Sequence, residues 1–157
     1  MKNPIEKIII GRRDRADFPE LGLFDIDVKV DTGAYTSSIH CHNITVVEGP
    51  GGKQVRFNLL DPSHADYDEK EFVLPIARIK HVKSSSGTSE KRFFIKTQIL
   101  LFSELIELEL SLTDRSDMKF PVLLGRKLLK KRFIVDVARF NLSYRHKQKH
   151  SKRFERI

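Results

Sequence analysis

The chain lacks the features that mark secreted and membrane-embedded proteins. Its 157 residues contain one cysteine, Cys41, so no disulfide can form within the chain and nothing indicates an oxidising compartment. The apolar run near its N-terminus, Ile8-Ile9-Ile10, is three residues long. A signal peptide needs an apolar stretch of roughly 7–15 residues, and a membrane span needs about 20. We therefore expect a cytoplasmic protein without a membrane partner.

Two common catalytic signatures are absent from the sequence. No Gly-x-x-x-x-Gly-Lys-Ser/Thr loop is present to cradle nucleotide phosphates, and no His-Glu-x-x-His pair is present to seat a catalytic zinc. His40-Cys41-His42 offers candidate ligands, because His40 and His42 would share one face of a strand. A zinc site there would need a third ligand, such as His64 or His81. We expect no metal and no cofactor, and interpret His40 and His42 as polar strand residues.

Basic residues are concentrated at the C-terminal end. Residues 126–157 hold 12 Lys and Arg against 2 Asp and Glu, whereas residues 1–125 hold 17 against 19. We expect one domain over residues 1–144, followed by a solvated basic tail over residues 145–157. The tail could serve solubility alone, or it could contact RNA, a ribosome or an acidic protein. No aromatic ladder for base stacking accompanies it.

The hydrophobic pattern predicts a mostly β chain. Many short apolar runs recur at a spacing of about 8–12 residues, which is typical of a closed barrel or a sandwich. Alternation is clearest over residues 23–30, where Leu23, Phe24, Ile26, Val28 and Val30 are interleaved with polar residues. The predicted strands are 8–10, 23–30, 38–47, 55–60, 72–82, 93–102, 105–113, 121–125 and 133–137. Residues 126–132 predict one short helix.

Asp31-Thr32-Gly33 follows the alternating strand directly. Gly33 lets the backbone turn sharply beneath the carboxylate, and the Thr32 hydroxyl can hydrogen-bond the neighbouring backbone. A plain turn without any catalytic role has the same composition. A second segment, Val122-Leu123-Leu124-Gly125, places apolar residues and a glycine just before the predicted helix.

Together these segments resemble the retroviral-protease fold, in which such an apolar strand packs beside an Asp-Thr-Gly loop and leads into a helix. A closer resemblance is to a bacterial and archaeal family named for ATP-dependent zinc proteases and often encoded near a ribosomal-protein glutamate ligase. Its three motifs read here as residues 31–40, 113–118 and 123–126. The resemblance implies a closed acid-protease (retropepsin-like) barrel with one short C-terminal helix, and an aspartic endopeptidase.

The resemblance also implies the site. It assigns a catalytic role to Asp31, with Thr32 and Gly33 holding the loop. The hairpin 84–89 would be the flap over the cleft. The substrate-binding residues would be Ala34, Tyr35, Ser85, Ser86 and Gly87.

One position departs from the viral pattern. Viral enzymes place an acidic residue after Asp-Thr-Gly-Ala, where it pairs with the arginine that follows the late glycine. Tyr35 and Thr36 stand there in this chain. Asp114 and Asp117 are the candidate partners for Arg126.

Aspartic-peptidase chemistry needs two carboxylates that share one proton, but the sequence holds one Asp-Thr-Gly. A peptidase would therefore be a homodimer with both Asp31 side chains on its two-fold axis, acting on a peptide or protein substrate. The alternative is a catalytically inert module of the same fold, which binds peptides or recognises an acidic tail through its basic C-terminal end.

Overall fold

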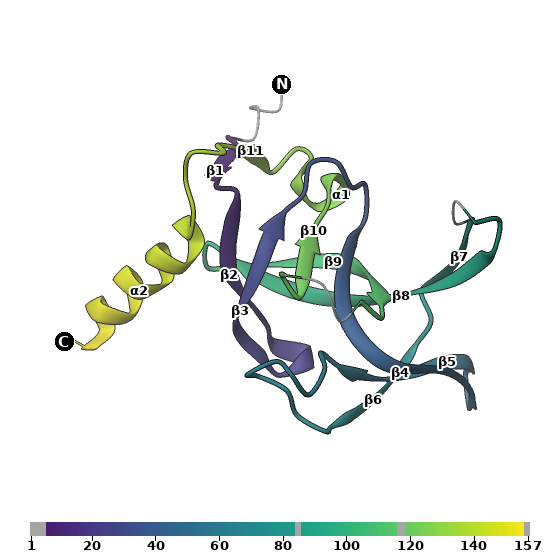
Figure 1. Cartoon of the computed structure of the whole chain (residues 1–157). Helices are drawn as coiled ribbons and strands as arrows, with labels where there is room; N and C mark the ends of the chain where they lie inside the picture. The colour runs from purple at the N-terminus through teal and green to yellow at the C-terminus, as the bar shows by residue number, and fades with distance from the viewer. Residues whose placement is uncertain (1–5, 84–85, 116–118, 156–157) are drawn as a thin grey trace.

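A computed structural model describes residues 6–83, 86–115 and 119–155. Strands dominate this part of the chain, as expected (Figure 1). The strands are β1 (Ile8–Ile10), β2 (Arg13–Phe18), β3 (Leu23–Val30), β4 (Ser37–Gly49), β5 (Gly52–Leu59), β6 (Glu71–Pro75), β7 (Arg78–Lys83), β8 (Ser89–Leu101), β9 (Glu104–Thr113), β10 (Val122–Leu124) and β11 (Phe133–Val135). The helices are a short 3-10 turn (Pro19–Leu21), α1 (Arg126–Leu129) and α2 (Leu142–Glu155).

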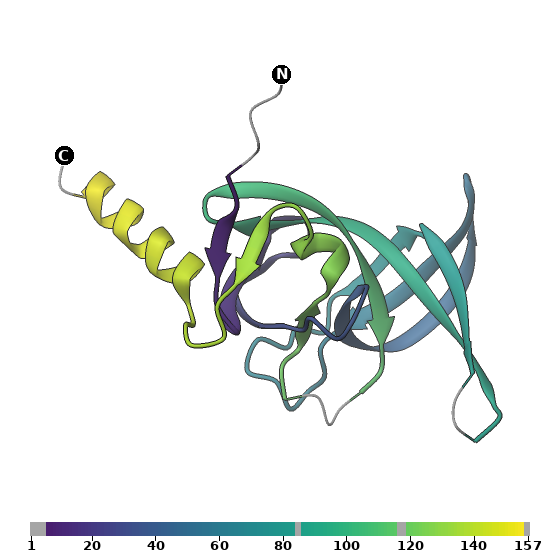
Figure 2. The same ribbon diagram turned by 90° about the horizontal axis from the view of Figure 1, so that it is seen from above.

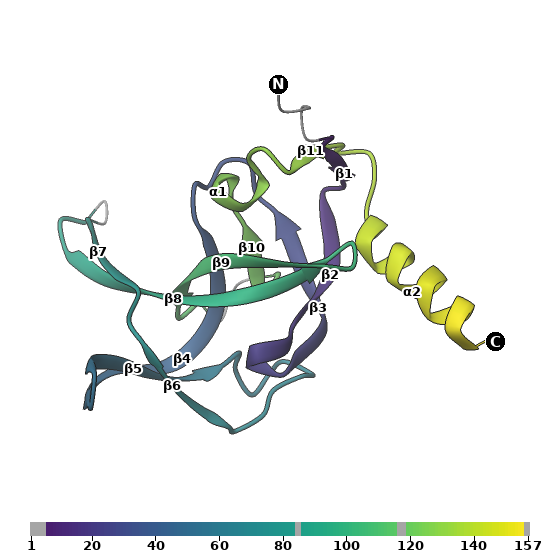
Figure 3. The same ribbon diagram turned by 180° about the vertical axis from the view of Figure 1, so that it is seen from behind.

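Strand β10 joins two ends of the main sheet. It pairs in parallel with β3 on one side and antiparallel with β4 on the other. From β3 the pairings continue through β2, β8 and β9, and then return to β4. Two arms extend from this body: β4 continues outward with β5 and β6, and β7 pairs with the outer part of β8 (Figure 3). A separate parallel pair, β1 with β11, lies beside α1.

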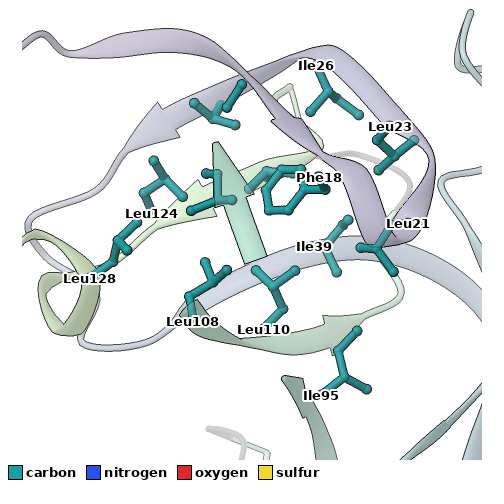
Figure 4. Close-up of a cluster of buried hydrophobic side chains, with 14 of the residues drawn as sticks. Phe18, Leu21, Leu23, Ile26, Ile39, Ile95, Leu108, Leu110, Leu124 and Leu128 are labelled. Atoms are coloured by element: carbon teal, nitrogen blue, oxygen red, sulfur yellow. The ribbon is translucent and has the colours of Figure 1, made fainter. Parts of the chain in front are cut away.

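Apolar side chains from these strands meet inside the body. On β3, Ile26 and Val28 are almost fully buried, whereas the intervening Asp27 is exposed. Figure 4 shows how residues from distant segments converge on one cluster, among them Phe18, Leu21, Ile39, Leu110, Leu124 and Leu128. Because a slip of one residue would turn each apolar face outward, this core fixes the register of the strands.

The start of β3 departs from the expected alternation. Phe24 is 60% exposed, and Asp25 adopts a left-handed backbone with φ 52°. The pairing with β2 shifts register between Ala16 and Phe18. A bulge of this kind reorients the side chains that follow it, so Phe24 lies outside the core although the sequence pattern included it.

The expected strand over residues 72–82 is two strands. Its first part, β6, pairs with β5, and its second part, β7, pairs with β8. Pro75 ends β6, because proline has no N–H to donate to a continuing ladder. The chain therefore changes partner within one apolar run.

The C-terminal end also differs from expectation. Of the residues expected as a solvated tail, 145–155 belong to α2, which begins at Leu142 and projects from one side of the body (Figure 2). The chain thus has a second helix after the short helix that the sequence predicts at 126–132, which is α1. Within the described ranges, no helix combines the length and the apolar character that crossing a membrane requires.

Candidate active site

The Asp31 loop is held against the end of β10. The Asp31 N–H donates to the carbonyl of Leu124 at 2.9 Å, and the Ala34 N–H donates back to the Asp31 carbonyl at 3.3 Å. One carboxylate oxygen of Asp31 accepts the N–H of Gly33 at 3.0 Å. The loop therefore turns back on itself beneath the carboxylate, and the second carboxylate oxygen is left for other donors.

Gly125 allows the segment after β10 to lie directly on this loop. A side chain at position 125 would place its Cβ 2.6 Å from the Thr36 carbonyl oxygen, which is closer than real contacts allow. The Gly125 N–H donates to the buried Ser37 hydroxyl at 3.0 Å. Next along the chain, the Arg126 N–H donates to the Ala34 carbonyl at 2.9 Å. The two motifs found in the sequence are thus joined by their backbones.

The Arg126 side chain reaches the tip of the loop. Its guanidinium donates to the Thr32 carbonyl at 2.9 Å and lies 5.7 Å from the centroid of the Tyr35 ring. Of the expected acidic partners, Asp114 makes no ion pair with Arg126 within the described ranges, and Asp117 lies outside them. Arg126 therefore braces the loop through a backbone carbonyl and an aromatic ring.

The outer side of the loop faces solvent. Thr32 and Gly33 are exposed, and Tyr35 is 55% exposed, while Asp31 and Ala34 are partly buried. Beside the loop lies an open hollow of about 480 Å³ with a mostly apolar wall. It is lined by Thr32, Tyr35 and Arg126 and by Leu129, Phe133, Val135 and three lysines, Lys7, Lys130 and Lys131.

The expected flap is a hairpin formed by β7 and β8. Ser86 and Gly87 lie at its tip, where Gly87 has φ 85°, and Ser85 lies outside the described residues. The tip stands at the end of an arm that projects from the body (Figures 1 and 2), so one chain does not bring Ser86 and Gly87 onto the Asp31 loop.

Glu109 connects this arm to α1. Its carboxylate accepts from Arg78 of β7 at 3.3 Å and from Lys127 of α1 at 2.9 Å. The hydrogen bond from Lys127, followed by the charges of Lys127 and Arg78, lowers the pKa of Glu109 against the opposing effect of desolvation. The base of the arm is therefore linked to the helix that follows Gly125.

The histidines of β4 hold the loop that follows β5. His40 is buried; its Nδ1 lies 3.1 Å from the Arg115 N and 3.3 Å from the Thr113 carbonyl oxygen, and its Nε2 contacts the Asp61 carboxylate. His42 contacts the carbonyl of Leu60 at 2.7 Å. In the portion of the chain that the structure describes, no group of three His, Cys, Asp or Glu side chains is arranged to hold a metal ion.

Asp61 is the residue that the sequence did not single out. Hydrogen bonds from Ser63, and then from His40, lower the pKa of Asp61 to about 2. The link holds the loop at residues 61–67 against β4 at His40, nine residues along the chain from Asp31. The Asp-Pro pair at 61–62 indicated a turn, but no local signal tied it to His40.

Comparisons with known proteins identify relatives of this chain. A protein from Desulfotalea psychrophila named "Probable alpha-L-glutamate ligase" is 38% identical over 142 residues, covering 88% of this chain and 30% of that protein. A protein of the same name from Shewanella pealeana is 37% identical over 134 residues, covering 83% and 28%. The chain thus spans less than a third of the length of these relatives.

A solved structure of a Legionella pneumophila protein of unknown function (DUF785) superposes with a TM-score of 0.71 at 27% identity, covering 88% of this chain and 99% of that one. The family described as "Retropepsin-like aspartic endopeptidase RimB" matches residues 9–146, which include the Asp31 loop, β10 and the start of α2. On this match, and on the identity with its relatives, the chain belongs to the RimB-like family of retropepsin-like proteins.

Proposed function

We propose that the chain is one subunit of a homodimeric aspartic endopeptidase with a closed acid-protease barrel, whose active site forms where two Asp31 loops meet. The observation that carries this proposal is the Asp31 loop itself. Its backbone is fixed by Leu124 and Gly125, it carries one Asp-Thr-Gly carboxylate, and its tip is open to solvent. The loop has a fixed backbone and an exposed outer side, so it is accessible to a second copy of the same loop.

The chemistry follows from two carboxylates placed about 3 Å apart. Like charges at this distance keep one proton between them, so one group is ionised while the other is protonated. The ionised Asp31 removes a proton from water, and the hydroxyl oxygen adds to the peptide carbonyl carbon. The protonated Asp31 of the partner protonates the carbonyl oxygen. The tetrahedral intermediate then breaks its C–N bond, and the amine leaves with a proton returned by the carboxyl pair.

The surface around the loop supports a dimer contact. The hollow beside Thr32 is lined by Leu129, Phe133 and Val135, of which Leu129 and Phe133 are buried and Val135 is partly exposed. On the neighbouring strands, Ile9 and Ile134 pair with each other across β1 and β11, and they are 44% and 55% exposed. In a two-fold dimer the same patch lies on both subunits, so one apolar surface covers another.

The charge of the hairpin arm supports an acidic peptide as substrate. Between residues 78 and 92 it carries five basic residues, Arg78, Lys80, Lys83, Lys91 and Arg92, against one acidic residue, Glu90. Arg78 is paired with Glu109, but most of β7 is exposed, so the positive charge of the arm as a whole attracts carboxylates. The relatives are named for glutamate ligation, which fits a substrate rich in glutamate.

Replacing Asp31 tests this function. Asp31→Asn retains the shape of the side chain and its contact with Gly33, so the fold and its thermal melting should be unchanged. Cleavage of glutamate-rich peptides, followed by mass spectrometry, should fall at least a thousandfold, because an amide cannot take the water proton. Retained cleavage by Asp31→Asn would reject the assignment. Tight peptide binding without cleavage by the unaltered protein would favour the inert binding module instead.

A further inference from the structure

Three arginine side chains gather around one aromatic ring on the far side of the molecule from the hairpin arm. The guanidinium carbons of Arg12, Arg13 and Arg145 lie 5.0, 4.5 and 5.1 Å from the centroid of the Phe140 ring. Arg12 precedes β2, Arg13 is the first residue of β2, and Arg145 belongs to α2. We call these three residues the arginine cluster.

The backbone beneath the arginine cluster is firmly held. The Arg12 N–H donates to the Arg139 carbonyl at 2.8 Å, and the Asn141 N–H donates to the Arg13 carbonyl at 2.9 Å. Gly11 lies so close to this segment that an added Cβ would stand 2.2 Å from the Arg139 oxygen. The segment before α2 is therefore packed directly on the segment before β2.

The helix itself is fastened to β2 and β3. The Asp14 carboxylate accepts the N–H groups of Ser143 and Tyr144 at 2.9 and 3.0 Å. One turn later, Lys147 donates to Asp17 at 2.8 Å and to Asp25 at 2.7 Å. These contacts hold α2 so that Arg145 faces the Phe140 ring, and the cluster is formed before any ligand arrives.

The charges of the arginine cluster are only partly balanced within the protein, where Arg12 donates to the Val137 carbonyl at 3.3 Å and the charge of Arg145 acts on the Asp14 carboxyl. In the described parts of the chain, none of the three arginines forms an ion pair with a carboxylate. The acidic groups nearby are engaged elsewhere: Asp14 with backbone N–H groups, Asp17 and Asp25 with Lys147, Asp27 with Arg15 and Asp136 with Arg139. Three like charges held at one ring repel one another, so an incoming anion is strongly favoured.

The positive surface continues on both sides of the arginine cluster. Arg15, which also pairs with Asp27 at 3.5 Å, lies over Tyr144 with its guanidinium carbon 5.0 Å from the ring centroid. Along α2, the exposed Lys149 follows Arg145 by one turn, at a rise of roughly 6 Å. The result is a band of cations backed by two aromatic rings, longer than a single small anion needs.

We propose that this band binds the sugar-phosphate backbone of a single-stranded nucleic acid. Arginine forks match phosphate oxygens in pairs, and a flat guanidinium supported by a ring presents its outer face to an unstacked base. Both features suit a single strand, in which phosphates and bases are reachable together. Helix α2, which carries Arg145, and the hairpin arm project from opposite sides of the body (Figures 1 and 3). This binding is independent of the peptidase activity proposed above.

Titration of a labelled oligouridylate of about 12 nucleotides, followed by fluorescence anisotropy, tests the proposal. The logarithm of the binding constant should fall linearly with the logarithm of salt concentration, by about 0.7 for each phosphate contact. The double variant Arg12→Gln with Arg145→Gln should bind at least tenfold more weakly and show a shallower slope. The matched control, Lys53→Gln with Lys96→Gln, removes the same charge from exposed positions elsewhere and should change binding less than twofold.

Four outcomes would overturn the proposal. The first is that no saturable binding occurs at about 50 mM salt, and the second is that the control variant loses as much affinity as the double variant. The other two are that oligoglutamate of equal charge competes as well as oligouridylate, or that duplex DNA competes equally well. Thermal melting checks that the double variant is folded. If it is not, Arg145→Gln alone decides the question, because this residue is exposed and its helix is anchored by Asp14 and Lys147.

Discussion

At the scale of single residues, Gly125 decides how closely the two motifs of the site can meet. Alanine at this position would bring its Cβ within 2.6 Å of the Thr36 backbone, which cannot move without displacing the Asp31 loop. We expect Gly125→Ala to lower the free energy of unfolding by about 1–3 kcal/mol, measured by urea denaturation. Gly51→Ala is the control, because nothing lies within 4 Å of its Cβ position. Equal stability of the two variants would show that the close approach is not required.

Asp61 makes the stability of the fold depend on pH in the acidic range. The pKa of Asp61 is about 2 in the folded protein and about 3.9 in an unfolded chain. Because the folded value is the lower one, ionised Asp61 stabilises the fold above about pH 4, and this contribution is lost as the pH falls toward 2.

Removing that carboxylate should flatten the acid dependence. We expect the unfolding free energy of Asp61→Asn to change less than that of the unaltered protein between about pH 4 and pH 2, in urea denaturation at several pH values. Glu48→Gln alters an exposed carboxylate on β4 and should keep the original dependence. A slope for Asp61→Asn that matches the unaltered protein would contradict the role given to the Ser63 and His40 contacts.

Some contacts of these residues could be predicted from the sequence, and others could not. The apposition of Asp31 with Gly125 was predictable because both lie in short motifs with a known order. The contact of Arg126 with the Thr32 carbonyl was not, since it replaces the expected acidic partner by a backbone group that no sequence pattern marks. The His40–Asp61 link joins residues 21 positions apart, and only the folded sheet brings them together.

At the scale of elements, α2 is held on the body of the protein by polar contacts more than by an apolar face. Leu142, Tyr144 and His146 are only partly buried, and the helix is rich in Lys and Arg. This composition explains why the sequence indicated a solvated tail. The contacts that order the helix come from Asp14, Asp17 and Asp25, which are far away in the sequence. The carboxylates of Asp17 and Asp25 raise the pKa of Lys147 even though its partial desolvation opposes them.

Removing the Asp14 anchor should loosen α2. Asp14 is buried, and burial raises the pKa of its carboxyl although three backbone N–H groups, of Ser143, Arg15 and Tyr144, oppose the shift. Asp14→Ala leaves these donors without their acceptor, which should cost about 1–3 kcal/mol and speed hydrogen exchange throughout α2. The control Asp27→Ala removes an exposed ion pair with Arg15 and should cost at most about 1 kcal/mol. Unchanged exchange in α2 of Asp14→Ala would show that other contacts order the helix.

For the strands too, the local sequence pattern did not predict every element. Most runs of alternating apolar residues became strands near their expected positions. Residues 13–18 were missed because Arg13, Asp14, Arg15 and Asp17 hide the alternation of β2. The run at 72–82 was merged because the change of partner from β5 to β8 depends on the sheet and not on the local sequence.

At the scale of the whole molecule, the chain presents two separate surfaces. The Asp31 loop and the basic hairpin arm belong to the proposed peptide site, whereas the arginine cluster lies where α2 packs on β2, on the side of the body away from the hairpin arm (Figure 1). The family and the mostly β fold are established by the match over residues 9–146 and by the strand pairings. The sequence could predict both from its motifs. It could not predict the second surface, because Arg12, Arg13 and Arg145 meet only when α2 packs on β2.

The central claim is that two copies of the chain meet at Asp31, and disulfide trapping tests it without a substrate. If the two loops face each other, Asp31→Cys chains bring their sulfurs within reach of a disulfide under mild oxidation. The native Cys41 will not interfere, since it is fully buried and burial raises the pKa of its thiol to about 12. Lys53→Cys, at an exposed site in the β4–β5 arm, is the control.

The readout is a non-reducing gel, on which a trapped dimer runs at twice the 18.2 kDa of one chain. We expect most of the Asp31→Cys protein to run as that dimer and to return to single chains on reduction, while Lys53→Cys stays single. Asp31→Cys protein that remains single, or that crosslinks no faster than the control, would contradict the claim that each chain carries half of the site.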